Sequence, residues 1–214
     1  MPAILQLNKL RETKLATDPF NYVVVRQFLS PEGLDGVRRD FPEVPGPGSH
    51  PPSELQIKGQ FKALMDELLG PEFKRAVEEK FSIDLTGRPT MYTVRGFTRA
   101  RDGKIHPDSE TKLITVLLYL NDDSWPSDGG RLRLLRSATD LEDFVEEVEP
   151  AGGTLLVFKR EDHSWHGHQS FEGPRRAIQL NWVTDNAVVW REQNRHGIGS
   201  KIKSLFGRGK AVDA

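Results

Sequence analysis

Hydrophobic residues repeat with one period in the first part of the chain and with another after residue 89. Before that point, apolar positions at helical spacing predict a helix over Leu55–Leu69, ended by Gly70, and a second helix from Phe73 to Phe81. After it, apolar and polar residues alternate, which is typical of strands. The six predicted strands span Thr90–Thr98, Lys112–Asn121, Arg131–Arg136, Phe144–Glu149, Thr154–Lys159 and Arg175–Val183.

Start and stop signals also mark the segments that precede these helices. A run of β-branched and aromatic residues predicts a strand over Asn21–Phe28. Ser30, followed by proline and glutamate, predicts the start of a helix that ends near Asp40, because serine caps helix N-termini and proline fits their first turn. Five prolines and two glycines between Pro42 and Pro52 predict an irregular loop, which is either a connector or a lid over a site.

Helices followed by short strands with glycine-rich turns predict an α+β protein that is mainly β. The strands would form a sandwich or barrel, with the helices packed on one face. For 214 residues we expect a single domain over residues 1–190, with helical support at 30–82 and a strand core at 88–184. Residues 191–214 are rich in basic residues. They predict a helix or tail that either stays solvated or contacts a membrane surface or a partner.

Composition excludes several classes of function. The 30 basic and 31 acidic residues give a net charge of −1, so we expect no nucleic-acid binding. The absence of cysteine excludes disulfides, thiolate metal sites and a cysteine nucleophile, so any metal must be held by His, Asp or Glu. Because the N-terminus lacks a signal pattern and no apolar run is long enough to span a bilayer, we expect a cytoplasmic protein.

Histidines and one carboxylate supply the candidate chemistry. His106 and Asp108 are two positions apart, so on an extended segment both side chains point the same way, and the proline between them favours extended backbone. Three of the six histidines, His163, His166 and His168, stand in one later run. An ordinary turn and a surface loop would explain each run separately. Together they predict the two-histidine, one-carboxylate site of non-haem Fe(II) enzymes.

The order of these residues resembles the Fe(II)/2-oxoglutarate-dependent dioxygenase superfamily, in its prolyl 4-hydroxylase-like branch. His106-x-Asp108 is followed, at a similar spacing to that of the family, by His166 and then by Arg175. Further stretches that are similar to segments of this branch are Val116–Asn121, Trp125, Gly129–Leu132 and Gly153–Phe158. The resemblance covers roughly Pro89 to Val183.

This resemblance implies a double-stranded β-helix, or jelly roll, at residues 88–184 and a hydroxylase that uses Fe(II), 2-oxoglutarate and O2. His106, Asp108 and His166 would hold the iron, and no further catalytic residue is implied. Arg175 would pair with the distal carboxylate of 2-oxoglutarate, assisted by the Tyr119 hydroxyl. Succinate and CO2 would be released, with ascorbate as a candidate reductant. The substrate would be a peptidyl side chain, a free amino acid or another small metabolite.

Some of these assignments have competitors. His163 and His168 compete with His166 for the metal, and Arg176 competes with Arg175 for the oxo-acid. Arg175 is favoured because it shares its strand face with the small and polar residues Ala177, Gln179 and Asn181. For the function, the alternative is a non-redox jelly-roll or cupin-like protein that binds a metal, a sugar or a peptide.

The chain also departs from the branch near the predicted substrate. Members often carry a tyrosine closer to the His-x-Asp motif than Tyr92 is here, and Arg95, Thr98 or Arg99 occupies that region instead. Ser170 replaces the usual proline after the distal histidine. The basic residues before His106 either bind an anionic substrate or form a solvated loop.

Overall fold

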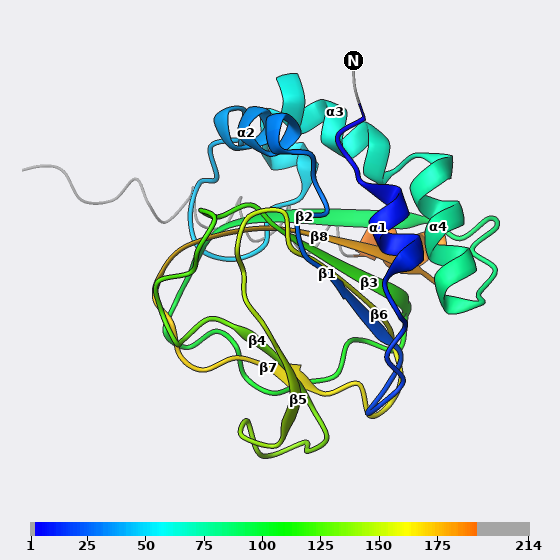
Figure 1. Cartoon of the computed structure of the whole chain (residues 1–214), viewed down its shortest axis with the longest axis vertical. Coiled ribbons are helices and arrows are strands. Elements are labelled where there is room, and N and C mark those ends of the chain that lie inside the picture. The colour runs from blue at the N-terminus through cyan, green and yellow to red at the C-terminus, as the bar shows by residue number, and fades with distance from the viewer. Residues whose placement is uncertain (1–2, 192–214) are drawn as a thin grey trace, which may run out of the picture.

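Two antiparallel sheets face each other in the structure, a computed structural model that describes residues 3–191 (Figure 1). The larger sheet has the strand order β1-β6-β3-β8-β2, and the smaller has the order β5-β4-β7. The strands are β1 (Tyr22–Val25), β2 (Thr90–Thr98), β3 (Lys112–Tyr119), β4 (Leu132–Leu135), β5 (Phe144–Val148), β6 (Leu155–Lys159), β7 (His166–Gly167) and β8 (Gly173–Val183). This arrangement is the predicted double-stranded β-helix.

The predicted strands are confirmed, with small shifts at their ends. β2 has its predicted bounds, but β3 ends at Tyr119 rather than Asn121. Beyond Tyr119, side-chain hydrogen bonds of Asn121 take the place of regular strand pairing. Its amide nitrogen donates to the Pro150 carbonyl at 2.7 Å, and its amide oxygen accepts from the backbone amide of Arg176 at 2.6 Å. β7 was not predicted, since two residues are too few to show an alternating pattern.

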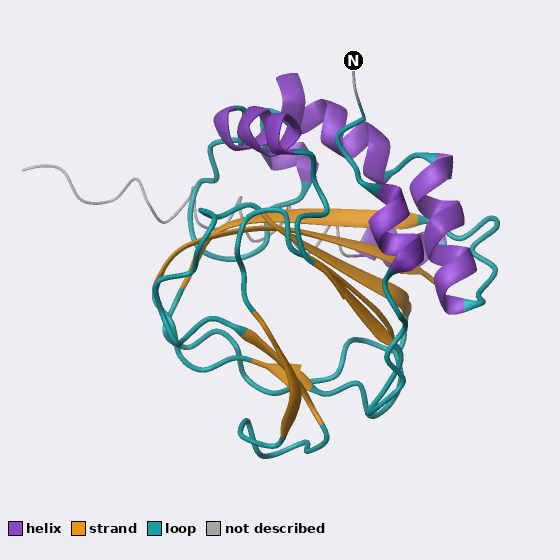
Figure 2. Ribbon diagram, viewed as in Figure 1, coloured by secondary structure: helices purple, strands orange, loops and turns teal. Residues whose placement is uncertain are grey.

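Four helices precede β2 and cover the outer face of the larger sheet (Figure 2). They are α1 (Leu7–Glu12), α2 (Pro31–Arg39), α3 (Gly59–Leu68) and α4 (Pro71–Phe81). The start of α2 is as predicted, because the Ser30 hydroxyl accepts a hydrogen bond from the Gly33 amide at 3.3 Å. The sequence did not predict α1, whose six residues are too short for a periodic pattern, so the helical layer begins before residue 30.

The helix predicted over Leu55–Leu69 is confirmed with its end one residue earlier, at Leu68, but its predicted start is wrong. α3 begins at Gly59 because the carboxylate of Asp40, at the end of α2, accepts a hydrogen bond from the Gln60 amide at 2.7 Å and caps the helix from outside. Gly59 has a φ of +56°, and a Cβ there would collide with that carboxylate. Gly70 does not end α3 in a left-handed conformation; with a φ of −77° it is the N-cap of α4.

The loop between Pro42 and Pro52 is irregular, as predicted, and continues into a 3-10 turn at Pro52–Glu54. It is attached to the edge strand β2, because the backbone groups of His50 and Val94 pair in both directions at 3.0 and 2.9 Å. Its Ser49 therefore lies beside the inner face of that strand.

Side chains that alternate along β8 separate two packing layers. Ile178, Leu180 and Trp182 belong to a large apolar cluster shared with the helices. Tyr119 and Ala177 belong to a smaller cluster between the two sheets. The helix layer thus supports the larger sheet from outside and leaves the space between the sheets to the residues of the site.

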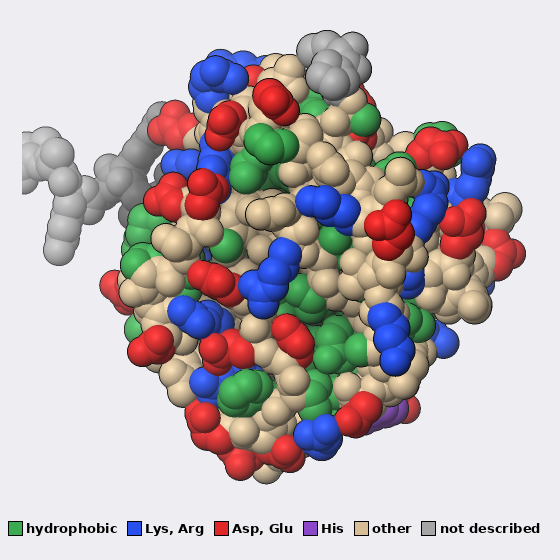
Figure 3. Space-filling model, viewed as in Figure 1, with side chains coloured by type: hydrophobic (Ala, Val, Ile, Leu, Met, Phe, Trp, Pro, Cys, Tyr) green, Lys and Arg blue, Asp and Glu red, His purple; other side chains and the backbone are tan. Residues whose placement is uncertain are grey.

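Lys and Arg side chains intermingle with Asp and Glu over the face drawn in Figure 3, in keeping with the near-zero net charge. Within residues 3–191, no helix is long and apolar enough to cross a membrane. A helical turn begins at residue 186, after β8. The basic segment predicted at 191–214 lies, from residue 192 onward, outside the described residues.

Phe73 of α4 joins the helices to the larger sheet. It is fully buried, and its ring lies 6.0 Å from the ring centroids of both Phe28 and Trp182. Phe73→Ala is expected to lower the free energy of unfolding by about 3–5 kcal/mol, because it leaves a cavity in this layer. Leu69→Ala, at an exposed position, should cost less than about 0.5 kcal/mol. Urea unfolding measures both, and equal losses would contradict the role given to this layer.

Candidate active site

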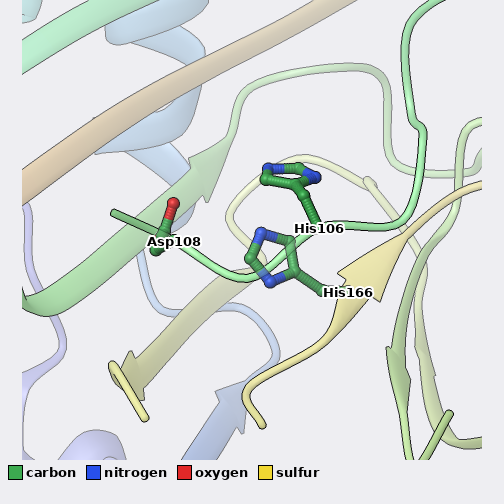
Figure 4. A group of neighbouring side chains, drawn as sticks. All are labelled: His106, Asp108 and His166. Carbon is green, nitrogen blue, oxygen red and sulfur yellow. The ribbon is translucent and has the colours of Figure 1, made fainter. Parts of the chain in front are cut away.

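Three predicted ligands meet at one end of the space between the sheets (Figure 4). His106 and Asp108 lie on the segment that leads into β3, and His166 lies on β7. The backbones of the two histidines pair in both directions at 3.1 Å, which places their rings 4.5 Å apart. One nitrogen of each histidine and one carboxylate oxygen of Asp108 lie within 4.8 Å of one another.

Each histidine ring is oriented by a backbone carbonyl. Nδ1 of His106 is 2.8 Å from the carbonyl oxygen of Lys104, and Nδ1 of His166 is 2.9 Å from that of Ser164. Because a carbonyl only accepts, Nδ1 carries a proton in both rings, which leaves Nε2 as the nitrogen that can bind a metal. This tautomer is the one that a metal ligand needs, so the donor set fits a divalent metal.

The carboxylate of Asp108 is held ionised by its neighbours. It accepts hydrogen bonds from the Lys112 ammonium at 2.6 Å and from the Thr115 hydroxyl at 2.5 Å. Burial acts to raise the pKa of Asp108, but Lys112, His166 and these hydrogen bonds together keep that pKa below its usual value. Asn181 of β8 donates to the Thr115 hydroxyl at 2.8 Å, so a chain of hydrogen bonds joins β8 to the carboxylate through β3.

His166 is neutral at physiological pH, because burial lowers its pKa to about 4. Its ring is 5% exposed and lies 5.1 Å from the ring of Phe158 on β6. A neutral imidazole offers the lone pair that metal binding requires.

Arg175 and Tyr119 form a second buried group between the sheets. The Arg175 side chain is 5% exposed, donates from Nε to the Gly130 carbonyl at 2.8 Å and from a terminal nitrogen to the Tyr119 hydroxyl at 3.3 Å. Its guanidinium lies 5.1 Å from the centroid of the tyrosine ring. Within residues 3–191 no carboxylate pairs with it. A buried cation without an acid partner is costly, and its place suits the binding of an anion.

The competing residues lie elsewhere. His163 is exposed and contacts the Pro19 carbonyl through Nε2 at 2.9 Å. His168 is buried, and its ring covers Gly103, where a Cβ would collide with it, but it is not part of the ligand group. Burial lowers the pKa of His168 to about 4. Arg176 projects from the other face of β8, with its guanidinium 5.0 Å from the Phe41 ring centroid.

A cavity of about 350 Å³ opens beside the ligand group. His106 and Asp108 form part of its wall, and the rest is mostly polar. The polar lining from β2, β8 and neighbouring loops includes Ser49, Thr93, Arg95, Gln179 and Asn181. The sequence had marked Gln179 and Asn181 through their shared face with Arg175, but it did not assign Thr115 or Lys112 to the site. The signal for Thr115 was a lone polar residue inside an apolar strand.

A sequence model of the 2OG-Fe(II) oxygenase superfamily matches residues 90–184, which contain the three ligands, Tyr119 and Arg175. Among curated proteins, none matches the chain.

Solved structures share the fold at low identity. A prolyl 4-hydroxylase of Pseudomonas putida is 20% identical, with a TM-score of 0.51, and the match covers 84% of this chain and 92% of that one. A prolyl 4-hydroxylase of Phytophthora capsici is 14% identical, with a TM-score of 0.55 and coverage of 85% and 68%. The iron-bound HygX of Streptomyces hygroscopicus is 14% identical, with a TM-score of 0.52 and coverage of 78% and 83%.

These structural likenesses show the fold, and the sequence match places the ligand group inside the family's own region. The sequence match covers 95 of the 214 residues and contains the predicted ligand group, so this region of the chain is similar to the 2OG-Fe(II) oxygenase superfamily.

Proposed function

We propose that His106, Asp108 and His166 hold Fe(II), and that Arg175 and Tyr119 bind the distal carboxylate of 2-oxoglutarate. The enzyme then hydroxylates an unactivated C–H bond of a substrate that reaches the cavity. The observation that carries this proposal is the buried Arg175, which has no acid partner among residues 3–191 and shares the space between the sheets with a ligand group. A binding module without redox chemistry has no need of both features.

The protein residues supply binding and orientation. His106, Asp108 and His166 would hold the metal, and the metal would in turn bind the oxo-acid and dioxygen. Lys112 and Thr115 keep Asp108 charged and in place, and the two carbonyl contacts keep the histidines in the ligating tautomer. The bound metal and 2-oxoglutarate would supply the oxidising chemistry, with succinate and CO2 as by-products. Ascorbate would serve only to keep the iron reduced.

The cavity limits the kind of substrate. A volume of about 350 Å³ suits an amino-acid side chain or a small metabolite more than a folded protein surface. The structural neighbours include prolyl 4-hydroxylases and also a HygX structure with nickel, 2-oxoglutarate and hygromycin B bound, which has a TM-score of 0.50. We therefore propose a peptidyl side chain, an amino acid or another small metabolite as the substrate.

The first test is loss of the carboxylate ligand. Asp108→Ala should weaken Fe(II) binding by more than the roughly 10- to 100-fold that follows loss of a residue supporting a ligand, and should abolish 2-oxoglutarate-dependent succinate formation. Glu110→Ala removes an exposed acid two positions away and should change neither property. Anaerobic titration against a competing chelator measures the affinity. Full activity in Asp108→Ala would show that Asp108 is not a metal ligand.

The second test concerns the oxo-acid. Arg175→Met should weaken 2-oxoglutarate binding to the metal-loaded enzyme by about 30-fold or more, because it removes one partner of a buried ion pair. Tyr119→Phe, which loses a single hydroxyl, should weaken it by about 5-fold. Arg176→Met removes the neighbouring guanidinium from the opposite strand face and serves as the control. Calorimetric titration measures the 2-oxoglutarate affinity of the three variants. A loss of affinity confined to Arg176→Met would show that Arg176, rather than Arg175, binds the oxo-acid.

The third test addresses the hydrogen-bond chain behind Asp108. Thr115→Val keeps the shape of the side chain but removes the hydroxyl that donates to Asp108 and accepts from Asn181. Fe(II) affinity should fall by about 10- to 100-fold. Thr139→Val, in an exposed loop, should leave it unchanged. The chelator competition used for Asp108 measures both variants, and an unaltered affinity in Thr115→Val would show that the chain does not orient the ligand.

A further inference from the structure

Arg95 is a cation that the proposed site does not use. It lies on β2, and its side chain lines the cavity beside His106 and Asp108. Its Nε is buried and has no hydrogen-bond partner. Throughout residues 3–191, Arg95 forms no ion pair. A guanidinium carries five N–H donors and no acceptor, and at this position they have no partner among residues 3–191.

The surroundings of Arg95 do not compensate its charge. The carboxylate of Asp102 acts on the charge of Arg95, but it already accepts a hydrogen bond from the Arg99 amide at 3.0 Å and pairs with the Arg99 guanidinium at 3.4 Å. Burial and the positive charge of Arg175 keep the pKa of Arg95 below its usual value, which shows that the field around it is unfavourable to a cation.

Arg95 lies to one side of the path proposed for 2-oxoglutarate. One end of that path is formed by Tyr119 of β3 and Arg175 of β8. The other end is the ligand Asp108, which lies just before β3 and is supported by Thr115 of β3 and, through it, by Asn181 of β8. Arg95 comes from β2, the strand beyond β8, where its backbone pairs opposite Ala177. It shares its part of the wall with Ser49, Met91 and Thr93. This part of the cavity remains for another molecule.

The charges of the proposed complex also indicate that an anion binds beside Arg95. The divalent metal and Arg175 are balanced by Asp108 and by the two carboxylates of 2-oxoglutarate. Arg95 then remains as a surplus positive charge at the cavity wall, where Lys112 adds another. Another anionic group would complete the balance.

We propose that Arg95 binds an anionic group, a carboxylate or a phosphate, of the primary substrate. This inference rests on the proposed function, since it takes 2-oxoglutarate to be held by Arg175. It narrows the substrate to an acidic metabolite or to a peptide with an acidic or phosphorylated group close to the C–H bond that is hydroxylated.

The test measures anion binding to the complete enzyme with both of its partners present. Protein loaded with Fe(II) and saturating 2-oxoglutarate is titrated anaerobically, at constant ionic strength, with acetate as a carboxylate probe and with sulfate as a stand-in for phosphate. Wild-type protein should bind at least one probe saturably, and the stronger probe identifies the class of anion. Arg95→Met should weaken that binding by about 10-fold or more, because it removes the charge and keeps the apolar stem. Arg101→Met, at an exposed position in the following loop, should leave it unchanged.

Separate outcomes distinguish this inference from the proposed function. If 2-oxoglutarate fails to bind the wild-type protein, the proposed function fails. If 2-oxoglutarate binds but neither probe does, the anionic substrate site is refuted. If Arg95→Met weakens 2-oxoglutarate itself by about 10-fold, Arg95 belongs to the co-substrate site, and the inference is also refuted.

Thermal stability separates a binding role from a structural one. Because Arg95 is unpaired in a cavity wall, Arg95→Met should keep or raise the melting temperature of the unliganded protein. A clear fall, with probe binding intact, would assign Arg95 to the framework of the sheet.

Discussion

The backbone pairing between His106 and His166 is the contact on which the site depends. It joins the segment entering β3, in the larger sheet, to β7 of the smaller sheet through two hydrogen bonds of 3.1 Å. The two residues are far apart in the chain, so the entropy of closing that loop is offset by the strands on either side. Once the backbones are paired, the carbonyls of Lys104 and Ser164 orient the two histidine rings. Asp108, two residues after His106 in the chain, lies on the same side. The outer helices hold the larger sheet in place and take no direct part.

An excess of positive charge between the sheets gives the site its chemical character. Asp108 is matched by Lys112, whereas Arg95 and Arg175 have no acid partner within residues 3–191. Burying unpaired cations lowers the stability of a fold, so a protein keeps them where a ligand completes the pairs. Arg175 and Arg95 lie on neighbouring strands, β8 and β2, and we propose that they bind two different anionic groups.

Much of the fold could be predicted because every strand of the core except β7 is an apolar or alternating run bounded by turn residues. The site could be predicted in part, since His106, Asp108, His166 and Arg175 stand in a characteristic order. What could not be predicted depends on contacts between distant segments. α3 begins where a carboxylate from α2 caps it, and β7 exists through pairing with β4 and the His106 segment. The contact of Thr115 with Asp108 and the isolation of Arg95 likewise appear only when the strands are assembled.

The most direct test of the central claim is an anaerobic optical titration, in which Fe(II) is added to the apo-protein and 2-oxoglutarate follows. Chelation of the oxo-acid by iron gives a weak visible charge-transfer band. The account predicts that this band appears with the wild-type protein, is absent from His166→Ala, and persists in His168→Ala. The absence of a band in wild-type protein that binds Fe(II), or its persistence in His166→Ala, would contradict the site described for this chain.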